Sequence, residues 1–115
     1  MKRLSACLAP ALALGAVPAA ANEPLTHDQA VGRLRACATA GATHASYSSL
    51  REALIAVRSL CRPQINRVYA GTDERVAADN PRASADLLDA LRVKARRKID
   101  RDLAVLVSTQ TGLAQ

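Results

Sequence analysis

The residues best suited to bind a ligand form a basic run near the C-terminus. Between positions 92 and 101, six basic side chains accompany a single acidic one, which puts a formal charge of +5 into ten positions. The six are Arg92, Lys94, Arg96, Arg97, Lys98 and Arg101. Such a run can hold an anion: the phosphate of a lipid headgroup or of lipopolysaccharide, or the carboxylates of an acidic protein.

The same run also fits a solvated helix face whose charges are partly neutralised by neighbours. Arg96 and Asp100 stand four residues apart, as do Lys98 and Asp102, which is the spacing of ion pairs along a helix. At about 100° per residue, the six basic side chains fall into two groups, with Arg92, Arg96 and Arg97 on one side and Lys94, Lys98 and Arg101 on another.

Other chemistries lack the residues that they need. With two tyrosines and no Phe or Trp, the chain has no rings interleaved with basic residues to stack on nucleic-acid bases. The chain has no glycine-rich phosphate loop and no H-E-x-x-H motif. His27 and His44 stand in polar surroundings typical of exposed side chains, and they do not converge with Cys37 and Cys61 on a zinc site. We therefore predict no catalytic residue, no metal, no cofactor and no nucleic-acid partner.

The N-terminus has the pattern of a secretory signal peptide. Lys2 and Arg3 precede an apolar stretch without charged residues, 4–17, and small residues follow at Ala19 and Ala21. A retained membrane anchor would need about 20 apolar residues, and this stretch is shorter. The sequence predicts a bacterial protein secreted to the periplasm or beyond, with a signal peptide at residues 1–21 and a single small helical domain at 22–115.

Removal of the signal peptide concentrates the positive charge. Lys2 and Arg3 leave the total of 16 basic residues, so 14 face 10 acidic ones and the mature chain carries +4. The whole excess lies in the run 92–101. No second apolar stretch approaches the length of a membrane span, so we expect no transmembrane segment in the mature chain.

Cys37 and Cys61 are the two cysteines of the mature chain. An even count in a small exported protein predicts a structural disulfide, worth roughly 3 kcal/mol in the chain-entropy account. In a tight antiparallel helix pair the two residues would lie roughly 18 Å apart, whereas a bridge needs Cα atoms within about 7 Å. We therefore expect the loop at 42–48 to run back alongside a helix.

The first helix is predicted at residues 27–40. The hydrophobic half of the composition comes almost wholly from Ala, Leu, Val and Ile, which together with the absence of Phe and Trp favours helices over an aromatic-rich sheet. Thr26 and Gln29 have the spacing of a capping box. Gly41 is the expected stop.

The second helix is predicted at residues 49–70, where Ser49 begins another capping box. Pro63 either kinks this helix near Cys61 or occupies the first turn of a new one. Gly71 is expected to close the unit, and residues 72–79 leave room for a further short helical turn.

The third helix is predicted at residues 81–107, because Asn80 and Pro81 make a strong start signal. At about 40 Å it is longer than its two neighbours can cover, so part of it is expected to project or to meet a second copy. The apolar side chains expected to face the core recur at helical spacing: Ala30, Val31, Leu34, Cys37, Ala38, Leu50, Leu54, Val57, Cys61, Ile65, Val68, Leu88, Leu91, Ala95, Ile99, Leu103 and Leu106.

The sequence thus predicts a small all-α domain of three helices, stapled by one disulfide. The favoured function is a non-enzymatic binding or interaction protein that acts through its long C-terminal helix, on an unknown protein partner or as a homodimer. The alternative is a peripheral envelope protein that binds anionic lipid or lipopolysaccharide through the basic run 92–101.

Export gives the first testable prediction. Cleavage is expected between Ala21 and Asn22, because Ala19 and Ala21 supply the small side chains that the processing site requires. Intact mass or N-terminal sequencing of the exported protein should show Asn22 as the first residue. Any other N-terminus contradicts the assignment.

Overall fold

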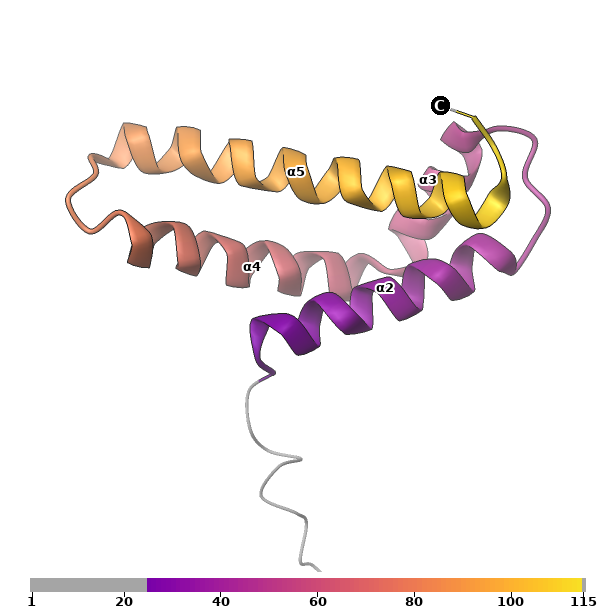
Figure 1. The fold of residues 1–115 in the computed structure, drawn as a ribbon, viewed down its shortest axis with the longest axis horizontal. Coiled ribbons are helices and arrows are strands. Elements are labelled where there is room, and N and C mark those ends of the chain that lie inside the picture. Colours follow the sequence, from indigo (N-terminus) through magenta and orange to yellow (C-terminus); the bar gives the residue numbers. More distant parts are fainter. Residues whose placement is uncertain (1–24, 115) are drawn as a thin grey trace, which may run out of the picture.

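Residues 25–114 are described by the computed structural model, and they form four α-helices (Figure 1). In chain order these are α2 (His27–Thr43), α3 (Leu50–Leu60), α4 (Arg62–Asp79) and α5 (Ala85–Thr111). No strand occurs between residues 25 and 114, which confirms the all-α class, but the helices number four rather than three. The predicted signal peptide lies outside the described residues.

Helix α2 begins as expected and ends later than expected. The Gln29 N–H donates to Thr26 Oγ1 at 3.2 Å and the Thr26 N–H donates to Gln29 Oε1 at 3.0 Å, which is the predicted capping box. The stop at Gly41 is wrong. A Cβ at this buried position would lie 3.1 Å from Leu60 Cδ2 and 3.3 Å from Val57 Cγ2. The glycine therefore serves the close approach of α3, not the end of a helix.

The predicted second helix is two helices. Of the two geometries open at Pro63, the structure has the new helix: α3 ends at Leu60, Cys61 leaves helical geometry with φ −100° and ψ 18°, and α4 resumes at Arg62. Pro63 lies in the first turn of α4, where its missing N–H costs no hydrogen bond. The expectation of one kinked helix over 49–70 was wrong.

The boundary between the last two helices also differs from the prediction. Gly71 does not end α4, which continues to Asp79, and Asn80 is its C-cap and not the start of the next helix. The Asn80 side chain donates to the carbonyl of Val76 at 2.9 Å. Ser84 caps α5 instead, by accepting from the Leu87 N–H at 3.2 Å.

Helix α5 is shifted along the chain from its predicted range of 81–107. It starts at Ala85 and ends at Thr111, where Gly112 adopts the left-handed conformation with φ 71° that closes a helix. The predicted end at residue 107 is therefore four residues early.

Helices α4 and α5 lie side by side as an antiparallel hairpin, and α2 crosses the half of this hairpin that is nearer to the C-terminus (Figure 1). Helix α2 packs against each of the other three helices. The predicted core stripes meet there, with Ala42, Ala53 and Val107 as additions. The buried apolar side chains are Ala30, Leu34, Ala38, Ala42, Leu50, Ala53, Val57, Cys61, Ile65, Val68, Leu103 and Val107.

The other half of the hairpin projects beyond α2 (Figure 1). We call residues 72–95 the hairpin arm. No residue between positions 69 and 102 is buried, and the predicted core residues Leu88 and Leu91 are half-buried. The arm therefore rests on contacts between its own two helices, whereas the rest of α5 is held by the core.

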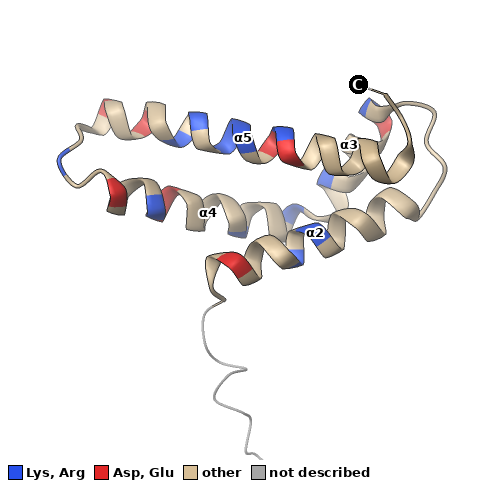
Figure 2. Cartoon of the chain, viewed as in Figure 1, with Lys and Arg blue, Asp and Glu red and all other residues tan. Residues whose placement is uncertain are grey.

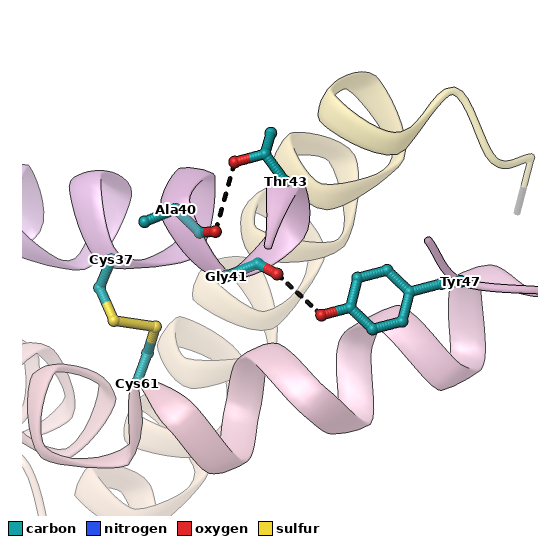
Figure 3. The surroundings of a disulfide bond; sticks show 6 residues. All are labelled: Cys37, Ala40, Gly41, Thr43, Tyr47 and Cys61. Carbon is teal, nitrogen blue, oxygen red and sulfur yellow. Dashed lines mark hydrogen bonds between the residues drawn. A yellow bond between two sulfur atoms is a disulfide. The ribbon is translucent and has the colours of Figure 1, made fainter. Parts of the chain in front are cut away.

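The disulfide joins Cys37 of α2 to Cys61 at the junction of α3 and α4 (Figure 3). Their Cα atoms are 5.9 Å apart, and Cys61 is fully buried. The Tyr47 hydroxyl donates to the carbonyl of Gly41 at 2.8 Å, which ties the connecting loop to the last turns of α2. The bridge therefore fixes the point at which three helices meet.

Loss of the bridge should destabilise the fold measurably. The double variant Cys37→Ala and Cys61→Ala is expected to lower the free energy of unfolding by about 3 kcal/mol, because the unfolded chain regains the freedom of the closed loop. Urea unfolding followed by circular dichroism gives the difference. Reduction of the wild-type protein is the matched control, since it opens the bridge without deleting side-chain atoms. Equal midpoints for the oxidised and reduced proteins contradict a structural role.

Candidate anion-binding face of α5

The structure divides the six basic residues of α5 into two sets. Arg92 and Arg96 stand four residues apart on the side that faces α4, and Arg92 is half-buried. Lys94, Arg97, Lys98 and Arg101 are exposed. The predicted grouping was wrong for Arg97, which lies with the lysines because it is three residues from Lys94 and four from Arg101.

Arg96 is held by α4. Its Nε and Nη2 donate to the two carboxylate oxygens of Asp73 at 3.2 and 2.5 Å, and its guanidinium lies 4.8 Å from the centre of the Tyr69 ring. These hydrogen bonds to Asp73 raise the pKa of Arg96 further above its usual value. A bidentate pair stacked on a ring favours arginine over lysine at this position. Arg96 therefore ties the two helices of the hairpin together.

Asp100 has partners outside its own helix. It accepts a hydrogen bond from the Tyr69 hydroxyl, and Arg58 Nη2 of α3 lies 3.4 Å from its Oδ1. Burial, followed by the hydrogen bond to Asp100, raises the pKa of Tyr69. The predicted ion pair between Arg96 and Asp100 is therefore absent, because each of the two side chains is engaged by α3 or α4.

The exposed set forms one continuous surface, which we call the cationic face: Lys94, Arg97, Lys98 and Arg101. The spacing of three and four residues stacks these side chains over two turns, roughly 10 Å along the axis of α5. Figure 2 shows the basic band in the middle of the helix. Within residues 25–114 none of the four has an ion-pair partner, so the predicted pair of Lys98 with Asp102 does not form. Like charges at this spacing repel one another, and a bound anion relieves that repulsion.

A groove between α3 and α5 adjoins the cationic face. Arg101 belongs to both, and the groove has a volume of about 760 Å³. Ile55 and Val105 line it although they are 60% and 56% exposed. Nothing in the sequence indicates this groove, because its walls come from two helices and the periodicity of each helix does not specify how the two pack.

The histidines contribute no metal site in the described part of the chain, where no three His, Cys, Asp or Glu side chains gather. His44 is exposed. His27 is half-buried rather than exposed, because Gly71 of α4 leaves room for its ring; a Cβ there would lie 2.7 Å from His27 Nδ1. Gly71 thus allows the start of α2 to approach α4.

Comparison with known proteins finds no matching family model, no matching curated protein and no matching solved structure. None of the helices formed by residues 25–114 has the combination of length and apolar character needed to cross a membrane.

Tyr69 supplies a test of the α3–α4–α5 contacts. In a Tyr47→Phe protein, Tyr69 is the remaining phenol of a chain with two tyrosines and no Trp, so phenolate absorbance reports its titration alone. We expect this pKa above the ordinary value of 10.0 because of burial and the hydrogen bond to Asp100. Adding Asp100→Asn should lower it. An unmoved titration contradicts the pairing.

The same shift has a consequence for stability. Because the folded state raises the pKa of Tyr69, its contribution is fully present below the unfolded value near pH 10 and is lost as the pH rises through the folded value. The free energy of unfolding should therefore fall more steeply above about pH 10 in the wild-type protein than in Tyr69→Phe. Parallel curves contradict the account.

Proposed function

We propose that this chain is an exported, non-enzymatic binding protein whose cationic face on α5 docks on an anionic lipid surface of the bacterial envelope. One observation carries the proposal: Lys94, Arg97, Lys98 and Arg101 point outward together without ion-pair partners among residues 25–114, while Arg96 is tied to Asp73. A solvated face neutralised by its own carboxylates would have the opposite arrangement.

Four of the five leucines of α5 are buried or half-buried, which favours lipid headgroups over a protein partner. A protein held by α5 would use apolar contacts from this helix. Leu103 is only 4% exposed, and Leu88, Leu91 and Leu106 are half-buried against the chain's own helices. Binding through the cationic face therefore relies on charge, and each Lys or Arg near an anionic membrane contributes about 1 kcal/mol.

The charge also argues against a symmetric dimer through this face. A two-fold dimer places the same patch of both copies in contact, so the four cations of one chain would meet the four of the other. An extended lipid surface supplies the opposite charge at many positions and needs no matching shape.

The titratable groups support a role without catalysis. Two groups with displaced pKa, Tyr69 and Arg96, belong to the contacts between helices. The third is Glu52, whose pKa is lowered by hydrogen bonds from the Ser48 hydroxyl and N–H at the start of α3. Each of these pKa shifts is explained by contacts that hold the fold together. None of them calls for a role in acid–base catalysis.

The test is co-sedimentation of the exported, oxidised protein with vesicles of anionic and of neutral phospholipid. The wild-type protein should bind the anionic vesicles alone and should dissociate as the ionic strength approaches about 1 M, where the screening length is about 3 Å. The triple variant Lys94→Gln, Arg97→Gln and Lys98→Gln should lose about 3 kcal/mol, roughly a hundredfold in partitioning.

The matched control removes the same number of charges from other helices: Arg33→Gln, Arg35→Gln and Arg62→Gln, all at exposed positions. It should bind nearly as the wild-type protein does. Equal losses in both triple variants would mean that net charge, not the cationic face, drives adsorption. Absence of binding to anionic vesicles at low salt would overturn the lipid proposal and would favour an acidic protein as the partner.

A further inference from the structure

The groove between α3 and α5 is lined by both apolar and basic side chains. Its apolar lining consists of Leu50, Leu54, Ile55, Ala104, Val105 and Ala114. Three arginines line it as well: Arg51 and Arg58 from α3 and Arg101 from α5. The one acidic side chain in the lining, Asp100, is already engaged by Tyr69 and Arg58.

Two of the apolar residues are unusual for a surface that faces water alone. Ile55 and Val105 belong to the exposed large hydrophobic side chains of the described residues, and they line the same groove from opposite helices. Scattered exposed apolar residues need no explanation, but two that line one groove together with three arginines make an amphipathic site. Such a site matches a ligand with an apolar tail and an anionic head.

The dimensions favour a flexible chain over a helix as the occupant. The volume of about 760 Å³ lies in the range of small-molecule sites, about 300–1,000 Å³. The wall that α3 provides, from Ser49 to Arg58, is roughly 13 Å long at the helical rise of about 1.5 Å. A wall of this length faces only about two turns of a docked α-helix, at about 5.4 Å a turn, which leaves a helix little contact in the groove.

We propose that this groove accepts one acyl chain of an anionic lipid, with the lipid phosphate held by the arginines of its lining. The inference rests on the proposed function and deepens it, because Arg101 is shared by the groove and the cationic face. A lipid bound in this way has its tail between Ile55 and Val105 and its phosphate beside Arg101. The cationic face then holds neighbouring headgroups while one chain leaves the bilayer plane for the groove.

Alkyl phosphates below their micelle concentration test the groove directly, without a membrane. Calorimetric titration of the exported, oxidised protein with octyl, decyl and dodecyl phosphate should show binding that tightens about tenfold for each pair of added methylenes, as expected when the added groups leave water. Inorganic phosphate tests the headgroup alone and should bind far more weakly. Alkyl maltosides test the tail without the charge and should also bind more weakly than the matching phosphates.

Two exposed residues provide the variant. Ile55→Asp with Val105→Asp puts carboxylates into the apolar lining and should weaken dodecyl phosphate binding by at least about tenfold, the cost of displacing about two methylene groups. Leu87→Asp with Val93→Asp is the matched control, since both residues are similarly exposed on α5 and do not line the groove. The control should bind as the wild-type protein does.

Different results contradict the acyl-chain site and the cationic face. Affinities for alkyl phosphates that do not depend on chain length, or equal losses in the two aspartate variants, overturn the acyl-chain site. Vesicle binding that is sensitive to salt would in that case still support the cationic face. Conversely, chain-length dependence together with absence of vesicle binding overturns the surface proposal and keeps the groove as a site for single amphiphiles.

Discussion

The covalent contact between Cys37 and Cys61 is the constraint on which the arrangement of the helices depends. It holds α2 against the point where α3 ends and α4 begins, with Cα atoms 5.9 Å apart. Small buried residues on both sides, including Gly41 and Ala53, let the helix backbones approach. Without rings of Phe or Trp to fill a wider interior, close packing of small side chains and a crosslink are the available means of stabilising so short a chain.

From this fixed point the hairpin of α4 and α5 extends past the cover of α2. Its outer half has no buried side chain, so polar pairs between the two helices carry much of the alignment. Arg96 engages Asp73 and stacks on Tyr69, and Tyr69 in turn donates to Asp100. These contacts engage Arg96, and the other cation on this side, Arg92, lies 4.0 Å from Asp89 of its own helix. The four cations of the cationic face point away from α4. The sequence alone does not show which side of α5 carries the unpaired charge.

The sequence predicted the all-α class, the disulfide pair and most of the core, because helical periodicity and cysteine count are local signals. The predicted ends of helices are wrong where a glycine has a tertiary role. Gly41 and Gly71 have the positions of helix stops in the sequence, yet each allows a neighbouring helix to approach. A helix that stops at Gly71 does not include Asp73. In the structure Asp73 lies four residues after Tyr69, on the same face of α4. A predicted α4 that reaches Asp79 would place Asp73 within reach of α5. The sequence would then indicate Asp73, and not Asp100, as a partner for Arg96.

In the proposed binding mode Lys94 and Lys98 face the anionic surface, and their rates of acetylation measure this directly. These are the only lysines after residue 21, so amine acetylation followed by mass spectrometry reports on them and on the α-amine alone. With anionic vesicles present, acetylation of both lysines should slow several-fold relative to the α-amine, and neutral vesicles should leave the rates unchanged. Unchanged lysine rates on vesicles that co-sediment with the protein would show that another face binds.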